Sequence, residues 1–288
     1  MALRPALAVF FTILFWGTSF TGIRMALDSF SPGALAMLRF SIASIVLWSI
    51  AIFAPVARPS LRDLPRLAGL GCIGITTYHV CLNFGQLTVA PGTTALLIQT
   101  APVFTAVFAH FAGIERLRWS TMQGIIVALT GTAILVVGQG RTVEFTIAAL
   151  AILTSAICTA TYFLFQRDLS TRYGVRSVTT WTLTAGTIPL WVFAPTALAE
   201  WPDATPTAIG ALVYIGVFPA AIAYLLWNWA VHELGASRVM MYLYLSPVVA
   251  MLSQWLLIRE SPAPLAIAGG LVTVAGVWMV NRARTASK

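Results

Sequence analysis

Charged side chains are scarce in this chain of 288 residues. Lys, Arg, Asp and Glu make up 9% of it, whereas hydrophobic residues make up 59%. An average soluble domain carries about 25% charged residues. So few charges could not cover the surface of a soluble protein of this size, and the mean hydropathy is +0.87. The composition therefore excludes an ordinary soluble enzyme, a disordered chain and a secreted disulfide scaffold, and lipid is the expected solvent.

Lysine and cysteine are nearly absent. The only lysine is Lys288, so the chain has no Walker A motif, and ATP-driven action by this chain alone is not expected. The net charge of +8 comes from scattered arginines with no basic stripe, which argues against a nucleic-acid partner. Three cysteines lie inside apolar runs; Cys72 and Cys81 are about 13.5 Å apart on one helix, too far for a disulfide.

Apolar runs of about 20 residues, the length needed to cross a bilayer, recur along the whole chain. The first run is too long for a cleavable signal peptide and is predicted to be a retained span. The sequence thus predicts an all-α integral membrane protein with ten transmembrane helices. The expected spans cover residues 6–24, 33–54, 67–87, 93–112, 121–138, 145–165, 177–198, 207–229, 238–258 and 263–280.

Basic residues predict the orientation, because cytoplasmic loops collect Arg and Lys. Arg24, Arg141 and Arg259 fall on one face of the predicted topology, and most other basic residues fall on the opposite face. Both termini are therefore expected in the cytoplasm, in a bacterial inner (plasma) membrane. The residues on the predicted cytoplasmic face are Arg4, Arg58, Arg62, Arg66, Arg116, Arg118, Arg167, Arg172, Arg176, Arg238, Arg282, Arg284 and Lys288.

The two halves of the chain resemble each other at a constant offset of 145 residues. We predict a first five-helix repeat over residues 1–140 and a second over 141–288. Because five is odd, the second repeat must be inverted, an arrangement that in transporters places the substrate site near the midplane between the repeats. The matching pairs are Gly71 and Gly216, Asn83 and Asn228, Pro102 and Pro247, Glu115 and Glu260, Gly124 and Gly269, and Gly131 and Gly276.

Short motifs in the first half resemble a known family. Phe15-Trp16-Gly17, Leu38-Arg39-Phe40, Ala101-Pro102-Val103-Phe104, Glu115-Arg116 and the spacing of Gly124 and Gly131 are similar to the EamA-type domain. Two such domains make a ten-span drug/metabolite transporter. Within that superfamily the chain most resembles bacterial amino-acid exporters of the YddG kind. The resemblance covers essentially the whole chain and implies export of small metabolites from the cytoplasm.

Polar side chains inside the spans are the candidate substrate-binding residues. His79, Asn83 and Gln86 share one helical face, and the repeat places Tyr224 and Asn228 at equivalent positions. They are expected to surround a central cavity, although hydrogen bonds that serve only packing are the alternative. His79 is suited to contact substrate or carry a proton. The full set is Trp16, Tyr78, His79, Asn83, Gln86, Gln99, Tyr162, Tyr224, Asn228 and Tyr244.

Other residues have expected structural roles. Pro102 and Pro247 lie near the middle of their predicted spans, where a proline kinks a helix; each is either a hinge for alternating access or a static bend. Arg39 is expected to snorkel toward the interface or to pair with Asp28. Glu115 and Glu260 are expected in salt bridges at span ends. The glycines spaced by seven residues should pack the fifth span on the tenth or form a dimer contact. They are Gly124, Gly131 and Gly138, with Gly269 and Gly276.

Together these features predict a secondary transporter that exports small metabolites, in particular aromatic or other neutral amino acids, by alternating access. The spans lack the paired carboxylates or Ser/His motifs of intramembrane enzymes, so catalysis is not expected. A cation exporter would need a carboxylate in mid-span, and none is present. No cofactor or metal is expected, and proton coupling stays open. The alternatives are an exporter of other small metabolites or drugs, or a non-transporting or channel-like membrane protein. Beside substrate and bilayer, the chain is expected as a monomer or homodimer.

Overall fold

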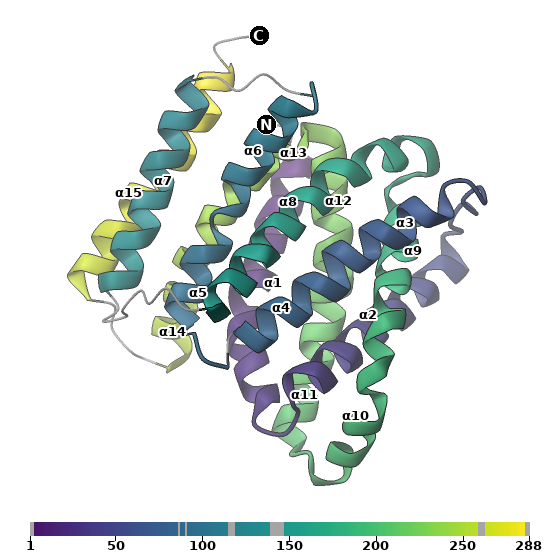
Figure 1. The fold of residues 1–288 in the computed structure, drawn as a ribbon. Coiled ribbons are helices and arrows are strands. Elements are labelled where there is room, and N and C mark those ends of the chain that lie inside the picture. Colours follow the sequence, from purple (N-terminus) through teal and green to yellow (C-terminus); the bar gives the residue numbers. More distant parts are fainter. Residues whose placement is uncertain are drawn as a thin grey trace.

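A computed structural model describes residues 3–85, 87–89, 91–114, 119–138, 147–258 and 263–285. All regular elements in these ranges are helical, with no strand among them (Figure 1). Gln86, Glu115 and Glu260 lie outside the described residues, as does the expected boundary between residues 140 and 141. So do some of the arginines used for orientation, namely Arg116, Arg118, Arg141 and Arg259.

The first half of the chain forms long helices joined by short connections. In α1 and α2 nearly every position is apolar, which is typical of helices buried in protein on one side and in lipid on the other. A π-helical turn, η1, separates α3 from α4. The elements are α1 (Leu3–Leu27), α2 (Pro32–Phe53), α3 (Leu64–Gly71), η1 (Cys72–Thr77), α4 (Tyr78–Gly85), α5 (Pro91–Ile98), α6 (Ala101–Phe111) and α7 (Trp119–Gly138).

The second half repeats this order. A π-helical turn, η4, separates α11 from α12 as η1 separates α3 from α4. Segments of 3₁₀ helix interrupt other helices. The elements are α8 (Ile147–Tyr173), α9 (Val175–Thr187), η2 (Ile188–Phe193), α10 (Ala194–Glu200), η3 (Trp201–Asp203), α11 (Pro206–Ile215), η4 (Gly216–Ile222), α12 (Ala223–Leu234), α13 (Ala236–Met240), η5 (Met241–Leu245), α14 (Ser246–Ile258) and α15 (Pro264–Thr285).

Seven helical runs in the described residues are long and apolar enough to cross a membrane. Two shorter apolar helices, Leu96–Phe111 and Pro264–Val280, coincide with further expected spans. Large apolar side chains such as Phe53, Phe111 and Ile147 are more than four-fifths exposed, which suits contact with lipid. The helices therefore lie where the apolar runs predicted them, while the count of ten spans stays a prediction.

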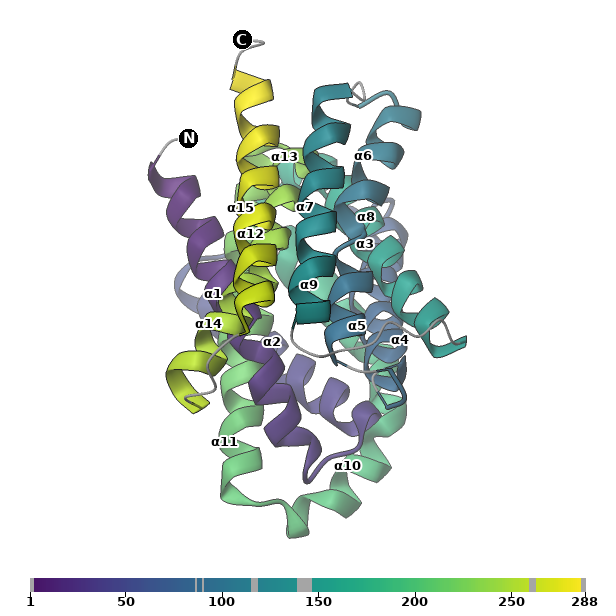
Figure 2. The same cartoon turned by 90° about the vertical axis from the view of Figure 1, so that its left-hand side faces the viewer.

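The two halves exchange partners in a reciprocal way. The first helix of each half packs on the third span of the other, so that α1 lies against α12 and α8 against α4. Likewise α3 packs on α9, and η4 packs on α2. The last helices, α7 and α15, run side by side along one flank (Figures 1 and 2). The chain enters α1 and leaves α15 at the same end of the bundle (Figure 2).

Glycines allow α7 and α15 to touch backbone to backbone. A Cβ atom on Gly131 would overlap the backbone nitrogen of Thr273, and one on Gly276 would overlap the backbone of Ala128. Gly124 and Gly138 meet α15 in the same way. Close approach through small residues is a common way to join membrane helices. Of the two roles expected for the glycine stripes, the structure therefore shows the packing of the fifth expected span on the tenth.

Candidate functional site

A buried cavity of about 90 Å³ lies between helices of both halves. Among the described residues that line it, Arg39 is the only Arg, Lys, Asp or Glu. The other lining side chains are aromatic, aliphatic or neutral polar. The cavity therefore combines one positive charge with a largely apolar surface. The lining residues are Trp16, Ser19, Ile23, Arg39, Tyr78, His79, Leu82, Ile98, Gln99, Thr159, Phe163, Tyr224, Leu243 and Ser246.

The structure brings half of the expected substrate-binding residues together at this cavity. Trp16, Tyr78, His79, Gln99 and Tyr224 line it. The other described members of the set lie elsewhere and are treated below. Whether any of them contacts substrate stays a prediction.

His79 lies at the start of α4, directly after the π turn η1. Its ring is 4.3 Å from the Phe40 ring and 4.5 Å from the Tyr78 ring, centroid to centroid. The side chain is buried, and neither ring nitrogen has a hydrogen-bond partner in the described part of the chain. Buried polar atoms are normally hydrogen-bonded, so each exception calls for an explanation. An unpaired imidazole on a cavity wall is available to a ligand.

Trp16 and Tyr224 form the aromatic wall. The Trp16 indole N–H donates to the carbonyl of Pro219, in η4, at 3.0 Å. This bond fixes the ring, which lies 5.8 Å from the Tyr224 ring and 4.9 Å from the fully buried Trp227 ring. Pro219 belongs to the second half of the chain, and Trp16 comes from the first half. The wall is thus held by a contact between the two halves.

Gln99 lies in a break between α5 and α6, where a continuous span was expected. Its side-chain Nε2 donates to the carbonyl of Leu243 at 2.9 Å. Leu243 belongs to η5, the interruption at the equivalent place in the second half. The amide orientation follows from this bond, because only the NH₂ group can donate. Oε1 of Gln99 therefore points elsewhere, and it has no partner among the residues that the structure describes.

The two expected hinge prolines begin helices in this structure. Pro102 lies in the first turn of α6, and Pro247 is the second residue of α14. At these positions the missing N–H would have had no partner within the helix. The interruptions therefore precede the prolines, at residues 99–100 and in η5. A role as hinges stays a prediction.

Arg39 differs from its sequence-based expectation. It does not reach the interface, since its side chain is only 5% exposed, and it makes no ion pair with Asp28 in the described structure. Its guanidinium carbon lies 5.4 Å from the Phe40 ring centroid, and Nε has no hydrogen-bond partner. Arg39 does not snorkel, because η4 packs on α2 at this level, where a Cβ on Gly216 would lie 3.2 Å from the Arg39 carbonyl. The sequence feature that points to this position is a lone charged residue, Arg39, inside a predicted span.

A second polar cluster surrounds Asn228 in α12, and its members do not line the cavity. Nδ2 of Asn228 donates to the hydroxyls of Thr179 at 2.8 Å and Tyr162 at 3.2 Å. Its Oδ1 accepts from Nε2 of Gln166 at 3.2 Å. The Tyr162 hydroxyl also lies 2.9 Å from the hydroxyl of Thr182. Asn228 and Tyr162, both expected in the substrate site, are therefore bonded to protein in this conformation.

The two remaining members of the expected set are separate from both clusters. Nδ2 of Asn83 donates to the carbonyl of Pro32 at 3.0 Å, which ties α4 to the start of α2. Tyr244 is fully buried in a cluster that includes Ala106 and Val277, near the junction of α7 and α15. Although the repeat places Tyr244 at the same depth as Gln99, Tyr244 does not line the cavity.

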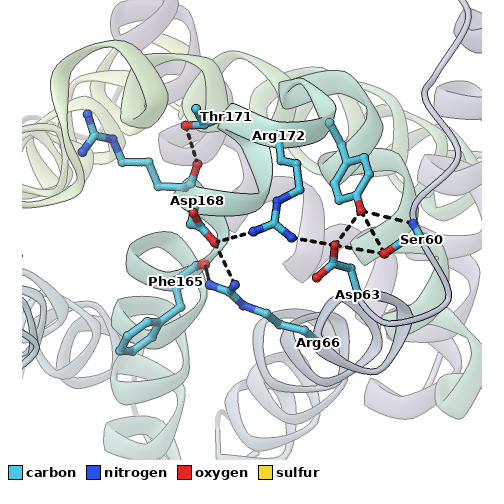
Figure 3. A network of polar contacts seen from close by, with 9 residues as sticks. Ser60, Asp63, Arg66, Phe165, Asp168, Thr171 and Arg172 are labelled. Atoms are coloured by element: carbon cyan, nitrogen blue, oxygen red, sulfur yellow. Dashed lines mark hydrogen bonds and ion pairs between the residues drawn. The ribbon is translucent and has the colours of Figure 1, made fainter.

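Polar networks join the two halves at both ends of the bundle. At one end (Figure 3), Arg172 lies 2.8 Å from Asp63 and 3.8 Å from Asp168, and Arg66 lies 2.8 Å from Asp168. The Tyr173 hydroxyl donates to Asp63 at 2.5 Å, and this bond, more than the Arg172 contact, holds the pKa of Asp63 below its usual value. At the other end, Glu200 accepts from the backbone N–H of Ser31 at 2.9 Å.

Comparisons with known proteins agree with this architecture. The model of the EamA-like transporter family matches residues 3–137 and 146–282. The uncharacterized transporter YdfC of Bacillus subtilis is 34% identical over 262 residues, covering 91% of this chain and 86% of YdfC. A probable terminal-alkyne amino-acid exporter of Streptantibioticus cattleyicolor is 34% identical over 275 residues, covering 96% and 92%.

A solved crystal structure shares the fold, with a TM-score of 0.81 over 99% of each chain at 21% sequence identity. The family match occurs twice and spans most of the chain, and the relatives named above are transporters. The expectation of a multi-pass membrane transporter with two EamA-like segments is thereby confirmed. The chain belongs to the EamA-like transporter family.

Proposed function

We propose that this protein is a secondary transporter that exports small metabolites, foremost neutral amino acids, from the cytoplasm by alternating access. In this proposal ten spans form two inverted five-helix repeats, and both termini lie in the cytoplasm of a bacterial cell. The observation that carries it is the buried cavity between the halves, lined by polar groups that have unused hydrogen-bonding capacity. Polar groups inside membrane spans are costly and usually mark a substrate path.

Reciprocal packing of the two halves supports the inverted repeat. Each half gives its first helix to the third span of the other, and each third span contains a π turn at an equivalent position, η1 or η4. Interrupted spans that meet near the repeat interface are a feature of transporter substrate sites. A second pair of interruptions, the break between α5 and α6 and the segment η5, is joined by the hydrogen bond from Gln99 to Leu243.

The size of the cavity supports a conformational cycle. Its volume of about 90 Å³ is well below the ~300–1,000 Å³ of ordinary ligand pockets. A substrate with a bulky side chain would need the surrounding helices to move apart. Alternating access supplies such a movement, because the site opens to one side of the membrane at a time.

Amino acids are the proposed substrates for two reasons. One relative with 34% identity is named a probable terminal-alkyne amino-acid exporter. In addition, no Asp or Glu is found among the described residues that line the cavity, which disfavours a bare cation as substrate. An exporter of other small metabolites or drugs is the second candidate, because the family match does not specify a substrate.

The test is counterflow in proteoliposomes that contain the purified chain. Vesicles loaded with each amino acid in turn would be assayed for uptake of the labelled compound, with and without a pH gradient. We expect saturable counterflow for at least one neutral amino acid, and acceleration by the gradient would indicate proton coupling. No flux of any amino acid would overturn the proposal, and non-saturable flux without counterflow would indicate a channel. A reporter at the C-terminus tests the orientation; periplasmic activity would contradict it.

A further inference from the structure

Arg39 is an ionic group whose charge nothing in the described protein neutralises. Its side chain is 95% removed from contact with solvent or lipid, and no acidic residue of the described chain pairs with it. An unpaired buried charge is among the most unfavourable features that a protein can carry. A guanidinium keeps its charge in proteins, so the cost cannot be avoided by loss of the proton. A ligand that brings a negative charge would remove this cost.

The position of Arg39 favours a carboxylate as that ligand. The residue lines the cavity, and its Nε–H has no acceptor in the described protein. Nε and a terminal nitrogen of a guanidinium form a planar pair of donors that matches the two oxygens of a carboxylate. Phe40 lies beside the guanidinium, 5.4 Å from it, and provides a cation–π contact that keeps the group in place without using its N–H donors.

Gln99 offers a hydrogen-bond acceptor on the same cavity, whereas Arg39 offers donors. Because its Nε2 is bonded to the Leu243 carbonyl, its free atom is the acceptor Oε1, which is buried and has no partner within the described residues. An unused acceptor repels a second anionic group and suits a donor such as an ammonium. A second negative group, such as a phosphoryl group, placed at Oε1 would leave this acceptor unsatisfied.

Aromatic rings line the cavity beside these two polar groups. Trp16 and Tyr224 are 5.8 Å apart, and Phe163 is 6.1 Å from Tyr224. All three line the cavity. They offer an apolar surface to the remainder of a substrate, and their faces attract a cation weakly. A molecule with a carboxylate, an ammonium and an uncharged body satisfies each of these groups at once.

We propose that Arg39 binds the carboxylate of the substrate and that Oε1 of Gln99 accepts from its ammonium group. The inference rests on the transport function proposed above and names the residues that recognise a zwitterion. It also explains why a positive charge is kept inside the membrane with no acidic partner: the partner arrives with each substrate. A structural role for Arg39 is the competing explanation, and it predicts a different result below.

The experiment compares three related compounds, leucine, leucinamide and N-acetylleucine, as competitors of labelled leucine counterflow in proteoliposomes. Leucinamide lacks the carboxylate and N-acetylleucine lacks the ammonium. If leucine is not carried, the set is rebuilt on an amino acid that is. For the wild type we expect both analogues to compete at least about tenfold more weakly, since tenfold corresponds to 1.4 kcal/mol of one lost interaction.

The variants are Arg39→Met and Gln99→Met, with Arg24→Met as the matched control because Arg24 is exposed at the end of α1. Arg39→Met should raise the KM for leucine at least about tenfold and reduce the preference for leucine over leucinamide to near unity. Its thermal midpoint in detergent should not fall, because an unpaired charge has been removed. Gln99→Met should lower the discrimination against N-acetylleucine, and Arg24→Met should change neither ratio.

The outcomes separate this inference from the proposed function. If the wild type carries no amino acid, both fail. If it carries amino acids and folded Arg39→Met keeps the wild-type KM and preference, only the present inference fails. A large loss of thermal stability in Arg39→Met, with the preference retained by the folded fraction, assigns Arg39 a structural role and overturns the inference. Arg39→Lys serves as a second variant, and it should keep the preference for leucine over leucinamide at reduced affinity.

Discussion

The third spans of the two halves carry polar side chains at equivalent positions, yet these side chains are used differently. In the second half, Asn228 makes three hydrogen bonds to protein, to Tyr162, Thr179 and Gln166. In the first half, both ring nitrogens of His79 lack a partner among described residues, while Asn83 makes one bond to Pro32. Equal depth in the membrane therefore does not mean equal hydrogen bonding. We infer that unused hydrogen-bonding capacity on the cavity wall, rather than depth, marks a candidate binding group.

This contrast gives a rule for mutations. Replacing a fully paired group should lower stability because partners are left buried and unsatisfied. Replacing an unpaired group that faces the cavity should lower transport while stability holds. Variants at both kinds of group, together with those at Arg39 and Gln99, test this rule by comparing transport with stability.

The largest effect is expected for His79→Phe. The phenyl ring keeps the packing between Phe40 and Tyr78 but removes both nitrogens. Transport should fall at least about tenfold, whereas the thermal midpoint in detergent should stay near that of the wild type. Counterflow at matched expression measures the first quantity. The control is His232→Phe, at a position that does not line the cavity, and it should retain transport; equal activity of the two variants would remove His79 from the site.

Asn228→Ala should show the reverse pattern. The variant leaves Nε2 of Gln166 and the hydroxyl of Thr179 without the partners that Asn228 supplies, and each unsatisfied buried group costs about 1–3 kcal/mol. We expect the free energy of unfolding to fall by about 2–4 kcal/mol, with transport by the folded fraction retained. A thermal or denaturant titration in detergent measures it. Wild-type stability together with lost transport would contradict the rule and place Asn228 in the substrate site.

Asn83→Ala should have a smaller effect on stability. It removes a single hydrogen bond to the Pro32 carbonyl, which at the start of α2 is also an acceptor for an N–H within the helix. A loss of about 1 kcal/mol is expected, measured in the same titration beside Asn228→Ala. A loss as large as that of Asn228→Ala would show that the number of bonds does not determine the cost.

The smallest effect is expected at the network outside the membrane. The hydrogen bond from Tyr173 lowers the pKa of Asp63 from its ordinary 3.8, so the carboxylate form favours the folded state. This contribution is present above about pH 4 and is lost as the pH falls through the lower pKa of the folded protein. Tyr173→Phe should therefore lower the thermal midpoint slightly at pH 6, and the difference from wild type should shrink toward pH 3. A constant difference would show that the bond does not act through the carboxylate.

Apolar runs and the internal repeat were enough to predict the helices and five of the fourteen cavity-lining residues. Trp16, His79 and Tyr224 could be found because polar or aromatic residues at equal depth in two repeats tend to meet near the axis between them. Arg39 was missed because its long side chain allowed a snorkelling explanation. Its burial depends on η4 approaching α2 at Gly216, a contact between halves that no local pattern encodes.

The expected kinks and the expected roles of Asn228 and Tyr162 show a second limit. A proline inside an apolar run predicts a kink, but whether it bends a helix or begins a new one depends on the residues before it. In the fourth expected span the break at Gln99 precedes Pro102. Likewise, the partners of Asn228 come from α8 and α9 and cannot be recognised from the sequence alone.

The π turn before α4 sets the angular position of His79. An α-helix advances about 100° per residue, and a π turn accommodates one more residue than an α turn. Were η1 to tighten into an α-helix, or were one residue of Cys72–Thr77 deleted, everything downstream would rotate by about that angle. Tyr78 and His79 would then leave the cavity while α4 stayed intact. The direction of these two side chains therefore depends on a single surplus residue, two to seven positions before His79 in the chain.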